Sequence, residues 1–337
     1  MRFLFGFVGG TGHLQPQLPI ARALTTAGHE VAFSTYFSMA AEVEAAGFEA
    51  FVTGPRVTKA PVVKPLLAPD QRREDEVLRT IFAERAIRER LPSVPEHCEA
   101  FRPDVVVCDE TDFGAQIAAG RLELPLATVL IGPTGAFPRR EAIADVLPAM
   151  VPPGLVLSGF PRSLRTVALP DVAHVYRACD PVQAGGDAIY FTLGTIFHLE
   201  CGDLPDRVLA GLHGYDVIET VTSFIPQAEV LPRCRAVVGH GGSGTLVATL
   251  AHGLPSVLIP LGADQLVNAA RAAELGFARV LHAVDATPDD IREAVVDVIE
   301  DPAYTRAARS IRDEIAALPP PESAVQLLTQ PRRVIET

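Results

Sequence analysis

Short apolar segments alternate with helix-length segments in two separate series along the chain. The first series opens with the apolar run 3–8, which leads into the glycine loop 9–12 and then into a helical pattern that ends at Gly28. The second series opens with the apolar run 188–193. Strands that alternate with helices form parallel sheets joined by right-handed crossovers. The sequence therefore predicts an α/β protein with two Rossmann-like, doubly wound parallel sheets.

Chain length and proline placement predict how the chain divides between these sheets. A length of 337 residues corresponds to about two domains. Residues 152–187 are irregular and rich in proline, so we place the connection between the domains there. We expect an N-terminal domain over 1–170, a linker over 171–187 and a C-terminal domain over 188–318. The tail 319–337 is expected to return to the N-terminal domain.

Charge and cysteine content argue against several classes of protein. The chain carries 29 basic and 41 acidic residues, a net charge of −12, so its overall field does not favour nucleic acid or an anionic membrane. Its five cysteines are widely spaced and form no C-x-x-C motif. This argues against a disulfide framework or a zinc site, and predicts reduced thiols and a cytoplasmic location. No apolar run approaches the ~20 residues of a membrane span.

The sharpest local signal is the segment 237–245, with the sequence VVGHGGSGT. An apolar strand runs here into a glycine loop that opens a helix. Unpaired N–H groups at such a helix start, together with the positive end of its dipole, form a cradle for phosphate. The alternative is a tight strand-to-helix turn capped by Ser243. A dehydrogenase is poorly supported because Val247 replaces the third glycine of the dinucleotide fingerprint, and the P-loop lysine pattern is absent from the sequence.

Polar residues are also expected at the carboxyl ends of the first sheet's strands, where open α/β sheets bind ligands. His13 follows the first strand, and an imidazole is a natural general base near neutral pH. Asp109 follows another strand of the same sheet, and its carboxylate within reach of His13 would fix the imidazole tautomer. Glu110 and Asp112 compete for that role. The alternatives are a structural turn histidine and acids that cap the next helix.

One further motif is the acid–amide pair Asp264-Gln265, which follows another strand and suits sugar hydroxyls or caps the next helix. It ends an ordered series of segments: Phe224-Ile225-Pro226-Gln227, Leu231, His240-Gly241-Gly242-Ser243-Gly244-Thr245, His252-Gly253-Leu254-Pro255 and Asp264-Gln265. This series resembles the donor-binding signature of the family 1 glycosyltransferases, which have the two-domain GT-B fold with both domains facing a cleft. The segments 190–195 and 12–16 resemble the loops that open the family's two domains, and 160–165 resembles its bacterial natural-product branch.

The resemblance implies an inverting transfer from a nucleotide-sugar donor to a small-molecule acceptor of the secondary-metabolite type. His13 would deprotonate the acceptor with Asp109 as its partner, while a helix start stabilises the leaving diphosphate. Residues 224–227 would meet the nucleobase and ribose, and 264–265 the sugar. No cofactor or metal is expected, because the sequence contains no D-x-D carboxylate pair. The implied donor-binding set is Gly12, Thr195, Phe224, Ile225, Gln227, His240, Gly242, Ser243, Gly244, Thr245, Asp264 and Gln265.

Two departures from the family pattern concern the nucleotide. The chain contains no Trp, so Phe224 stands at the nucleobase position where relatives often have Trp. Ala248 stands where plant relatives have a glutamate that binds ribose hydroxyls. Since 2′-deoxyribose lacks one of those hydroxyls, we favour a dTDP-sugar over a UDP-sugar.

The acceptor region of the family corresponds to residues 54–100, which are few in number here and carry few large apolar side chains apart from Ile81 and Phe82. Residues 71–91 within it carry dense alternating charge, which predicts a solvent-exposed helix. A small acceptor and an open acceptor site both fit this pattern.

Other interpretations stay open. One is a GT-B nucleotide-sugar epimerase or hydrolase, which needs no acceptor, and another is a non-catalytic nucleotide-sugar-binding partner protein, which would not need His13. A homodimer and a requirement for an activator protein are also compatible with the sequence. GT-B enzymes close their domains around the donor, so we expect a hinge within residues 165–187.

Overall fold

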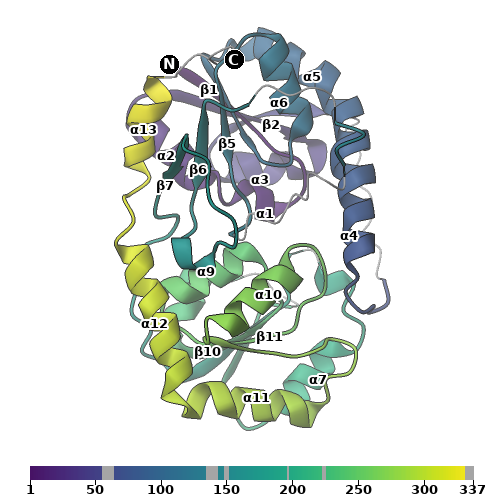
Figure 1. Ribbon diagram of the computed structural model, residues 1–337, viewed down its shortest axis with the longest axis vertical. Coiled ribbons are helices and arrows are strands. Elements are labelled where there is room, and N and C mark those ends of the chain that lie inside the picture. The colour runs from purple at the N-terminus through teal and green to yellow at the C-terminus, as the bar shows by residue number, and fades with distance from the viewer. Residues whose placement is uncertain (55–63, 134–142, 148–151, 196, 222–224, 331–337) are drawn as a thin grey trace.

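The computed structural model describes residues 1–54, 64–133, 143–147, 152–195, 197–221 and 225–330. Two parallel sheets form its two halves, one above the other in Figure 1. The first has the order β3-β2-β1-β4-β5-β6-β7 and the second the order β12-β11-β10-β8-β9. This confirms the predicted class of two doubly wound α/β halves. The strands of the first sheet are β1 (Arg2–Gly6), β2 (Glu30–Tyr36), β3 (Glu49–Thr53), β4 (Val105–Asp109), β5 (Leu126–Val129), β6 (Leu155–Ser158) and β7 (Ala173–Val175).

Helices pack on both faces of the first sheet. Alternate residues of β1 point to opposite faces, and both sets are apolar because a parallel sheet is buried on both sides. Phe3 and Phe5 face α2, while Leu4 faces the helices α5 and α6. The helices of this half are α1 (Thr11–Leu14), α2 (Leu18–Thr26), α3 (Ala40–Ala45), α4 (Gln71–Val77), a π-helical segment (Leu78–Arg85), α5 (Ala86–Phe101) and α6 (Phe113–Arg121).

The second sheet is built in the same way. Ile189 and Phe191 of β8 pack against α7 and α11, and Tyr190 packs on the other face. The strands are β8 (Ala188–Thr192), β9 (Val217–Glu219), β10 (Cys234–Gly239), β11 (Ser256–Leu258) and β12 (Ala278–Val280). The helices are α7 (Leu204–Gly211), α8 (Gln227–Val230), α9 (Ser243–Ala251), α10 (Gln265–Glu274), α11 (Pro288–Glu300) and α12 (Pro302–Ala316).

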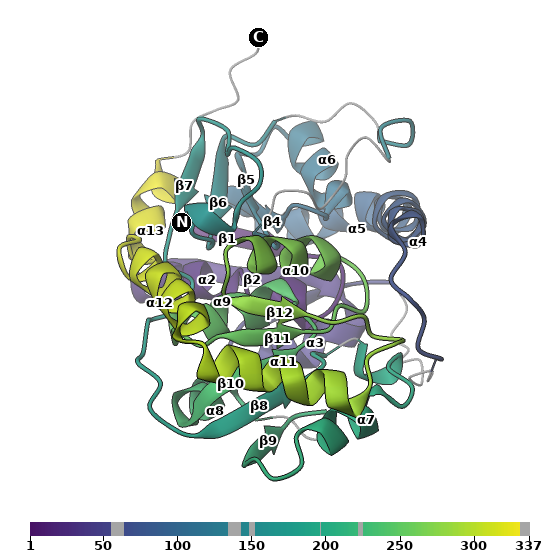
Figure 2. The same ribbon diagram turned by 60° about the horizontal axis from the view of Figure 1, so that its bottom comes forward.

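The last helix, α13 (Glu322–Thr329), crosses back to the first half. Figures 1 and 2 both show α12 beside the second sheet and α13 beside the first. Ala324 and Leu328 of α13 are buried in the core formed by α2 and the first sheet. Within the described residues, none of the helices combines the length and the apolar character needed to cross a bilayer.

The structure corrects the expectation that residues 152–187 are irregular. This stretch contains β6, which pairs in parallel with β5, and β7, which pairs in parallel with β6, so both strands extend the first sheet. Both strands are only three or four residues long. Pro153, Pro161 and Pro170 lie just outside them. Short strands between prolines leave too few residues for a recognisable period, which is why the sequence pattern missed them.

The structure also corrects the expectation of one solvent-exposed helix over 71–91. The segment divides into α4, the π-helical segment and α5, and α5 continues to Phe101. Arg90 is completely buried rather than exposed. Its guanidinium forms an ion pair with Asp112 at 2.5 Å and donates to Ser34 Oγ and Thr53 Oγ1. A charge pattern alone does not reveal such a buried partner on another element.

Candidate active site

The reversal of strand order in the first sheet places His13 and Asp109 at one edge. β2 and β3 lie on one side of β1 and β4 lies on the other, and ligands of open sheets bind at the carboxyl ends of strands at such a reversal. His13 lies in α1, just after the loop that follows β1. Asp109 is the last residue of β4, which pairs directly with β1. The topology therefore places these two residues at one edge of the sheet, as the sequence predicted.

The two side chains are in direct contact. His13 Nδ1 lies 3.0 Å from Asp109 Oδ2. Asp109 is fully buried, and His13 is 8% exposed. Phe82 of the π-helical segment stacks on the imidazole, with ring centroids 5.4 Å apart and planes inclined by 16°. With Nδ1 facing the carboxylate, the other ring nitrogen, Nε2, is the one available to take a proton.

Gly9 makes room for this imidazole. Its φ of +109° lies in the region that favours glycine. A Cβ at this position would come within 2.5 Å of His13 Cδ2. The glycine loop after β1 is thus shaped around His13.

The two competing acids have other partners. Asp112 pairs with Arg90, and its Oδ1 also accepts a hydrogen bond from the Ala115 amide at the start of α6. Glu110 Oε1 accepts from the amides of Ile131 at 2.9 Å and Gly132 at 3.3 Å, so it shapes the loop after β5. Of these three acids, Asp109 is the one that contacts the imidazole.

The predicted phosphate cradle lies at the start of α9 in the second half. β10 ends at Gly239, and the first intrahelical bond of α9 runs from the Leu246 amide to the Gly242 carbonyl. The amides of residues 243–245 precede that bond and point out of the helix start. No side chain caps this end, so the alternative of a capping Ser243 is wrong. Gly244 has open space where a Cβ would lie.

His240 fills the space beside this helix start. Its ring packs against Gly242 and Gly194, and a Cβ on Gly194 would lie 2.5 Å from His240 Nε2. The residue is 7% exposed, and burial lowers the pKa of His240 to about 4, an effect that the nearby Thr192 backbone partly offsets. The imidazole is therefore neutral near pH 7 and carries one N–H group. Its Nδ1 has no hydrogen-bond partner among the described residues.

Asp264 lies in a network beside the cradle. Its Oδ2 accepts from Asn268 Nδ2 at 2.8 Å and from the Ser243 hydroxyl. Burial raises the pKa of the Asp264 carboxyl, while these two hydrogen bonds act in the opposite direction. Asp264 occupies the N-cap position of α10, as the alternative predicted, but its side chain makes no capping bond to that helix. Asp264 is instead tied to the first residue of α9.

The side chains of Gln265 and Gln227 form hydrogen bonds within the second half. Gln265 Oε1 accepts from the amides of Leu261 at 2.8 Å and Gly262 at 3.3 Å. Gln227 Nε2 donates to Thr245 Oγ1 at 2.9 Å. The carboxamide oxygen of Gln265 is thus hydrogen-bonded to its own loop, an arrangement that the sequence pattern did not indicate.

The two halves meet at this place. A Cβ on Gly132, in the loop after β5, would lie 3.8 Å from Ser243 Oγ and 3.9 Å from Asp264 Oδ2. The charge of His13 also lowers the pKa of Asp264, although less than burial raises it. Glu74 of α4 contacts the second half as well, because its carboxylate lies 2.8 Å from where a Gly262 Cβ would be. His13 and the cradle therefore face each other between the two sheets.

The other predicted residues divide into three groups. Thr195 is exposed after β8, and Gly12 has open space on its Cβ side. Ile225 and Ala248 both pack against one apolar cluster of the second half. Phe224 lies outside the described residues.

Two residues that the sequence analysis did not predict, Thr111 and Asn268, hold the predicted acids in place. Thr111 stands two positions after Asp109, and Asn268 stands four positions after Asp264. This spacing is the one signal for them in the sequence.

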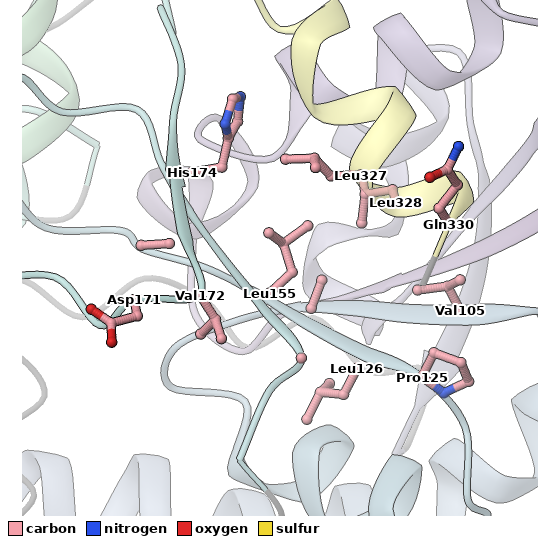
Figure 3. Close-up of a pocket in the computed structure, with 13 residues that line it drawn as sticks. Val105, Pro125, Leu126, Leu155, Asp171, Val172, His174, Leu327, Leu328 and Gln330 are labelled. Carbon is pink, nitrogen blue, oxygen red and sulfur yellow. The ribbon is translucent and has the colours of Figure 1, made fainter. Parts of the chain in front are cut away.

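A cavity of about 250 Å³ lies elsewhere in the first half. Figure 3 shows it between α13 and the amino ends of the strands, lined by Val105, Leu126, Leu155 and Leu328. His13 and Asp109 lie at the carboxyl ends of the strands, so this cavity belongs to the packing of α13 and not to the candidate site. Across the described ranges, no three His, Cys, Asp or Glu side chains are grouped so that they could hold a metal ion.

The chain is similar in sequence to several known proteins. Residues 213–330 match the family model "Erythromycin biosynthesis protein CIII-like, C-terminal domain". The chain is 25% identical over 413 aligned positions to the 3-alpha-mycarosylerythronolide B desosaminyl transferase of Saccharopolyspora erythraea, covering 96% of this chain and 97% of the relative. It is 41% identical over 153 residues to the elloramycin glycosyltransferase ElmGT of Streptomyces olivaceus, covering 45% of this chain and 33% of the relative.

Solved structures give the same fold. The spinosyn rhamnosyltransferase SpnG superposes with a TM-score of 0.82 at 20% identity, covering 98% of this chain and all of that one. Its complex with thymidine diphosphate gives 0.79 at 21% identity, covering 97% of this chain and 99% of that one. The chain is therefore a glycosyltransferase of the GT-B fold that is similar, along nearly its whole length, to named bacterial glycosyltransferases.

Proposed function

We propose that this enzyme transfers a sugar, with inversion, from a thymidine diphosphate donor to an apolar small-molecule acceptor. The observation that carries the proposal is the buried contact between His13 Nδ1 and Asp109 Oδ2 at 3.0 Å. This pair faces the start of α9 across the boundary between the two sheets. A base and a diphosphate cradle on opposite sides of one site are what an in-line displacement at a sugar carbon requires.

In the proposed reaction, His13 Nε2 takes the proton of the acceptor nucleophile as the nucleophile attacks the anomeric carbon. Asp109 stabilises the imidazolium that forms. The bond to the diphosphate breaks on the opposite face of the sugar, which inverts the anomeric centre. The amides of residues 243–245 and the N–H of neutral His240 stabilise the charge that develops on the leaving diphosphate. We propose no metal or cofactor for these steps.

A thymidine diphosphate donor is supported by the chemistry at position 248. Ala248, which packs against the same apolar cluster as Ile225, has only a methyl group where a carboxylate would suit the ribose 2′-hydroxyl. A deoxyribose needs no such acceptor. The structural similarity to SpnG, solved with thymidine diphosphate, agrees with this choice. Asp264, which is partly exposed beside the cradle, is the proposed contact to the donor sugar.

An apolar acceptor is supported by the wall next to His13. Phe82 stacks on the imidazole and packs with the buried side chains of Leu78, Phe113 and Ile143. A polar acceptor would leave hydroxyl groups unpaired against this wall, which is unfavourable. The names of the relatives, which include an erythronolide desosaminyl transferase and an elloramycin glycosyltransferase, point to the same type of aglycone.

The direct test is a transfer assay. TDP-glucose, TDP-rhamnose and UDP-glucose are each incubated with macrolide, anthracycline and phenolic aglycones, and products are identified by mass spectrometry and by the NMR coupling of the anomeric proton. The proposal expects a glycoside of inverted configuration, made faster from a TDP donor. Free sugar or an epimerised donor in the absence of aglycone would favour an epimerase or hydrolase instead. Nucleotide binding without any turnover would favour a non-catalytic partner protein.

A further inference from the structure

Beyond the His13–Asp109 pair, we propose that Thr111 is a positioning residue whose hydroxyl holds His13 in the Nδ1–H tautomer. This inference rests on the proposed role of His13 as the base. Thr111 is fully buried in the turn between β4 and α6. Its hydroxyl lies between both members of the pair, 2.7 Å from Asp109 Oδ1 and 3.3 Å from His13 Nδ1.

The first step concerns Asp109. Its Oδ1 accepts three hydrogen bonds, from the Thr111 amide at 2.6 Å, the Thr111 hydroxyl at 2.7 Å and the Asp112 amide at 2.9 Å. Three donors around one carboxylate oxygen leave no position for a proton on it. They also fix the rotation of the carboxylate, so that the other oxygen, Oδ2, points at His13 Nδ1.

The second step concerns the hydroxyl. A threonine hydroxyl has a single hydrogen, and Asp109 Oδ1 cannot supply one, so the hydrogen goes to Asp109. The hydroxyl oxygen then presents a lone pair to His13 Nδ1. Both atoms that face Nδ1, namely Asp109 Oδ2 and Thr111 Oγ1, are therefore acceptors. Nδ1 must carry the ring hydrogen, and Nε2 keeps the lone pair that general-base catalysis needs.

Three variants test this inference. Thr111→Val keeps the shape of the side chain and removes the hydroxyl, while Thr111→Ser keeps the hydroxyl. Thr128→Val is the matched control, because Thr128 is buried on the neighbouring strand β5 and its hydroxyl has no partner among the described residues. Each variant is assayed for kcat and KM with TDP-glucose. The His13 tautomer is read from ¹⁵N chemical shifts of histidine-labelled protein, assigned by difference with His13→Asn.

The expected results are specific to positioning. Wild type shows the Nδ1–H tautomer. Thr111→Val lowers kcat by about tenfold, with KM for the donor unchanged, and populates a second tautomer of His13. Thr111→Ser recovers both the rate and the tautomer, and Thr128→Val matches wild type. If Thr111→Val does not fold, Thr111→Ala carries the same expectations, because it removes the hydroxyl without adding volume.

Several outcomes would overturn the inference. Wild-type His13 protonated on Nε2 would do so at once, as would a Thr111→Val enzyme with the wild-type kcat. A lower kcat in Thr111→Val with His13 still protonated only on Nδ1 would leave Thr111 with a merely structural role. Full turnover by His13→Asn would instead remove the proposed base itself, which separates failure of that role from failure of the Thr111 inference.

Discussion

The imidazole of His13 lies 3.0 Å from the carboxylate of Asp109 although 96 positions separate the two residues in the chain. The parallel pairing of β1 with β4, in which Gly6 lies opposite Cys108, brings them together. The contact is thus a product of the sheet topology, together with the glycine loop after β1 that makes room for the imidazole. Its position between the first sheet and the start of α9 is the basis of the predictions below.

Replacing Asp109 by asparagine tests the role of the carboxylate. The amide has the same shape but cannot stabilise an imidazolium by charge, and its NH₂ group can turn towards His13 Nδ1 and favour the wrong tautomer. We expect Asp109→Asn to lower kcat by about 10²–10⁴-fold. Affinity for TDP, measured by isothermal titration calorimetry, should stay at the wild-type value because the donor cradle lies on the other half. An equal loss of TDP affinity would argue for a general folding defect.

The substitution Gly194→Ala tests the packing of His240. An alanine Cβ at this position would lie 2.5 Å from His240 Nε2 and would displace the ring from the phosphate cradle. Gly276→Ala is the matched control, since both glycines have a positive φ, of 71° and 76°, but nothing lies within 4 Å of a Cβ on Gly276. We expect Gly194→Ala to weaken TDP binding by about tenfold through loss of one charge-assisted hydrogen bond, and Gly276→Ala to leave it unchanged. Similar affinities for the two variants would show that His240 does not contact the nucleotide.

Two buried histidines predict a loss of stability in mild acid. Burial lowers the pKa of His240 and of His97 to about 4, from 6.5. The unfolded chain therefore binds more protons than the folded chain between pH 6.5 and 4, so the free energy of unfolding falls as the pH falls through this window. Each histidine contributes on the order of 2 kcal/mol between pH 7 and pH 5.

Urea unfolding at pH 7 and pH 5 measures this effect. His97→Asn removes one of the two titrating groups, so it should reduce the difference between the two pH values by about half. His213→Asn, which removes an exposed histidine just after α7, is the control. A difference that is unchanged in His97→Asn would mean that other groups cause the acid sensitivity.

Loss of the ion pair between Arg90 and Asp112 is expected to destabilise the fold strongly. Both side chains are fully buried, and Arg90 Nη2 lies 2.5 Å from Asp112 Oδ2. Arg90→Met leaves the carboxylate buried without its partner, and we expect it to lower the free energy of unfolding by about 3–5 kcal/mol. Arg88→Met, on an exposed position of the same helix α5, should change it by less than about 0.5 kcal/mol. Equal effects of the two substitutions in urea titrations would contradict the buried network.

The sequence predicted the fold class well because strand–helix alternation and glycine stops are local signals. It predicted that His13 and Asp109 share a sheet edge for the same reason. Strands β6 and β7 were missed because they are too short to show a period, and the burial of Arg90 was missed because its partners come from three other elements. The hinge expected within residues 165–187 stays a prediction.

The finer chemistry of the site depends on contacts that leave no pattern in the sequence. Asn268 reaches Asp264 from the next helical turn, and the Gln265 oxygen turns back to its own loop. An acid–amide pair looks the same in sequence whether it caps a helix, closes a loop or faces a ligand. The packing of the neighbouring loop decides between these uses.

The most direct test of the account is a comparison of wild type with His13→Asn, using TDP-glucose and an aglycone that wild type accepts. Turnover and TDP affinity are measured on the same preparations. The account predicts that His13→Asn lowers kcat by about 10²–10⁴-fold while the Kd for TDP is unchanged, because the base acts on the acceptor and not on the nucleotide. A His13→Asn enzyme that turns over at the wild-type rate would contradict it.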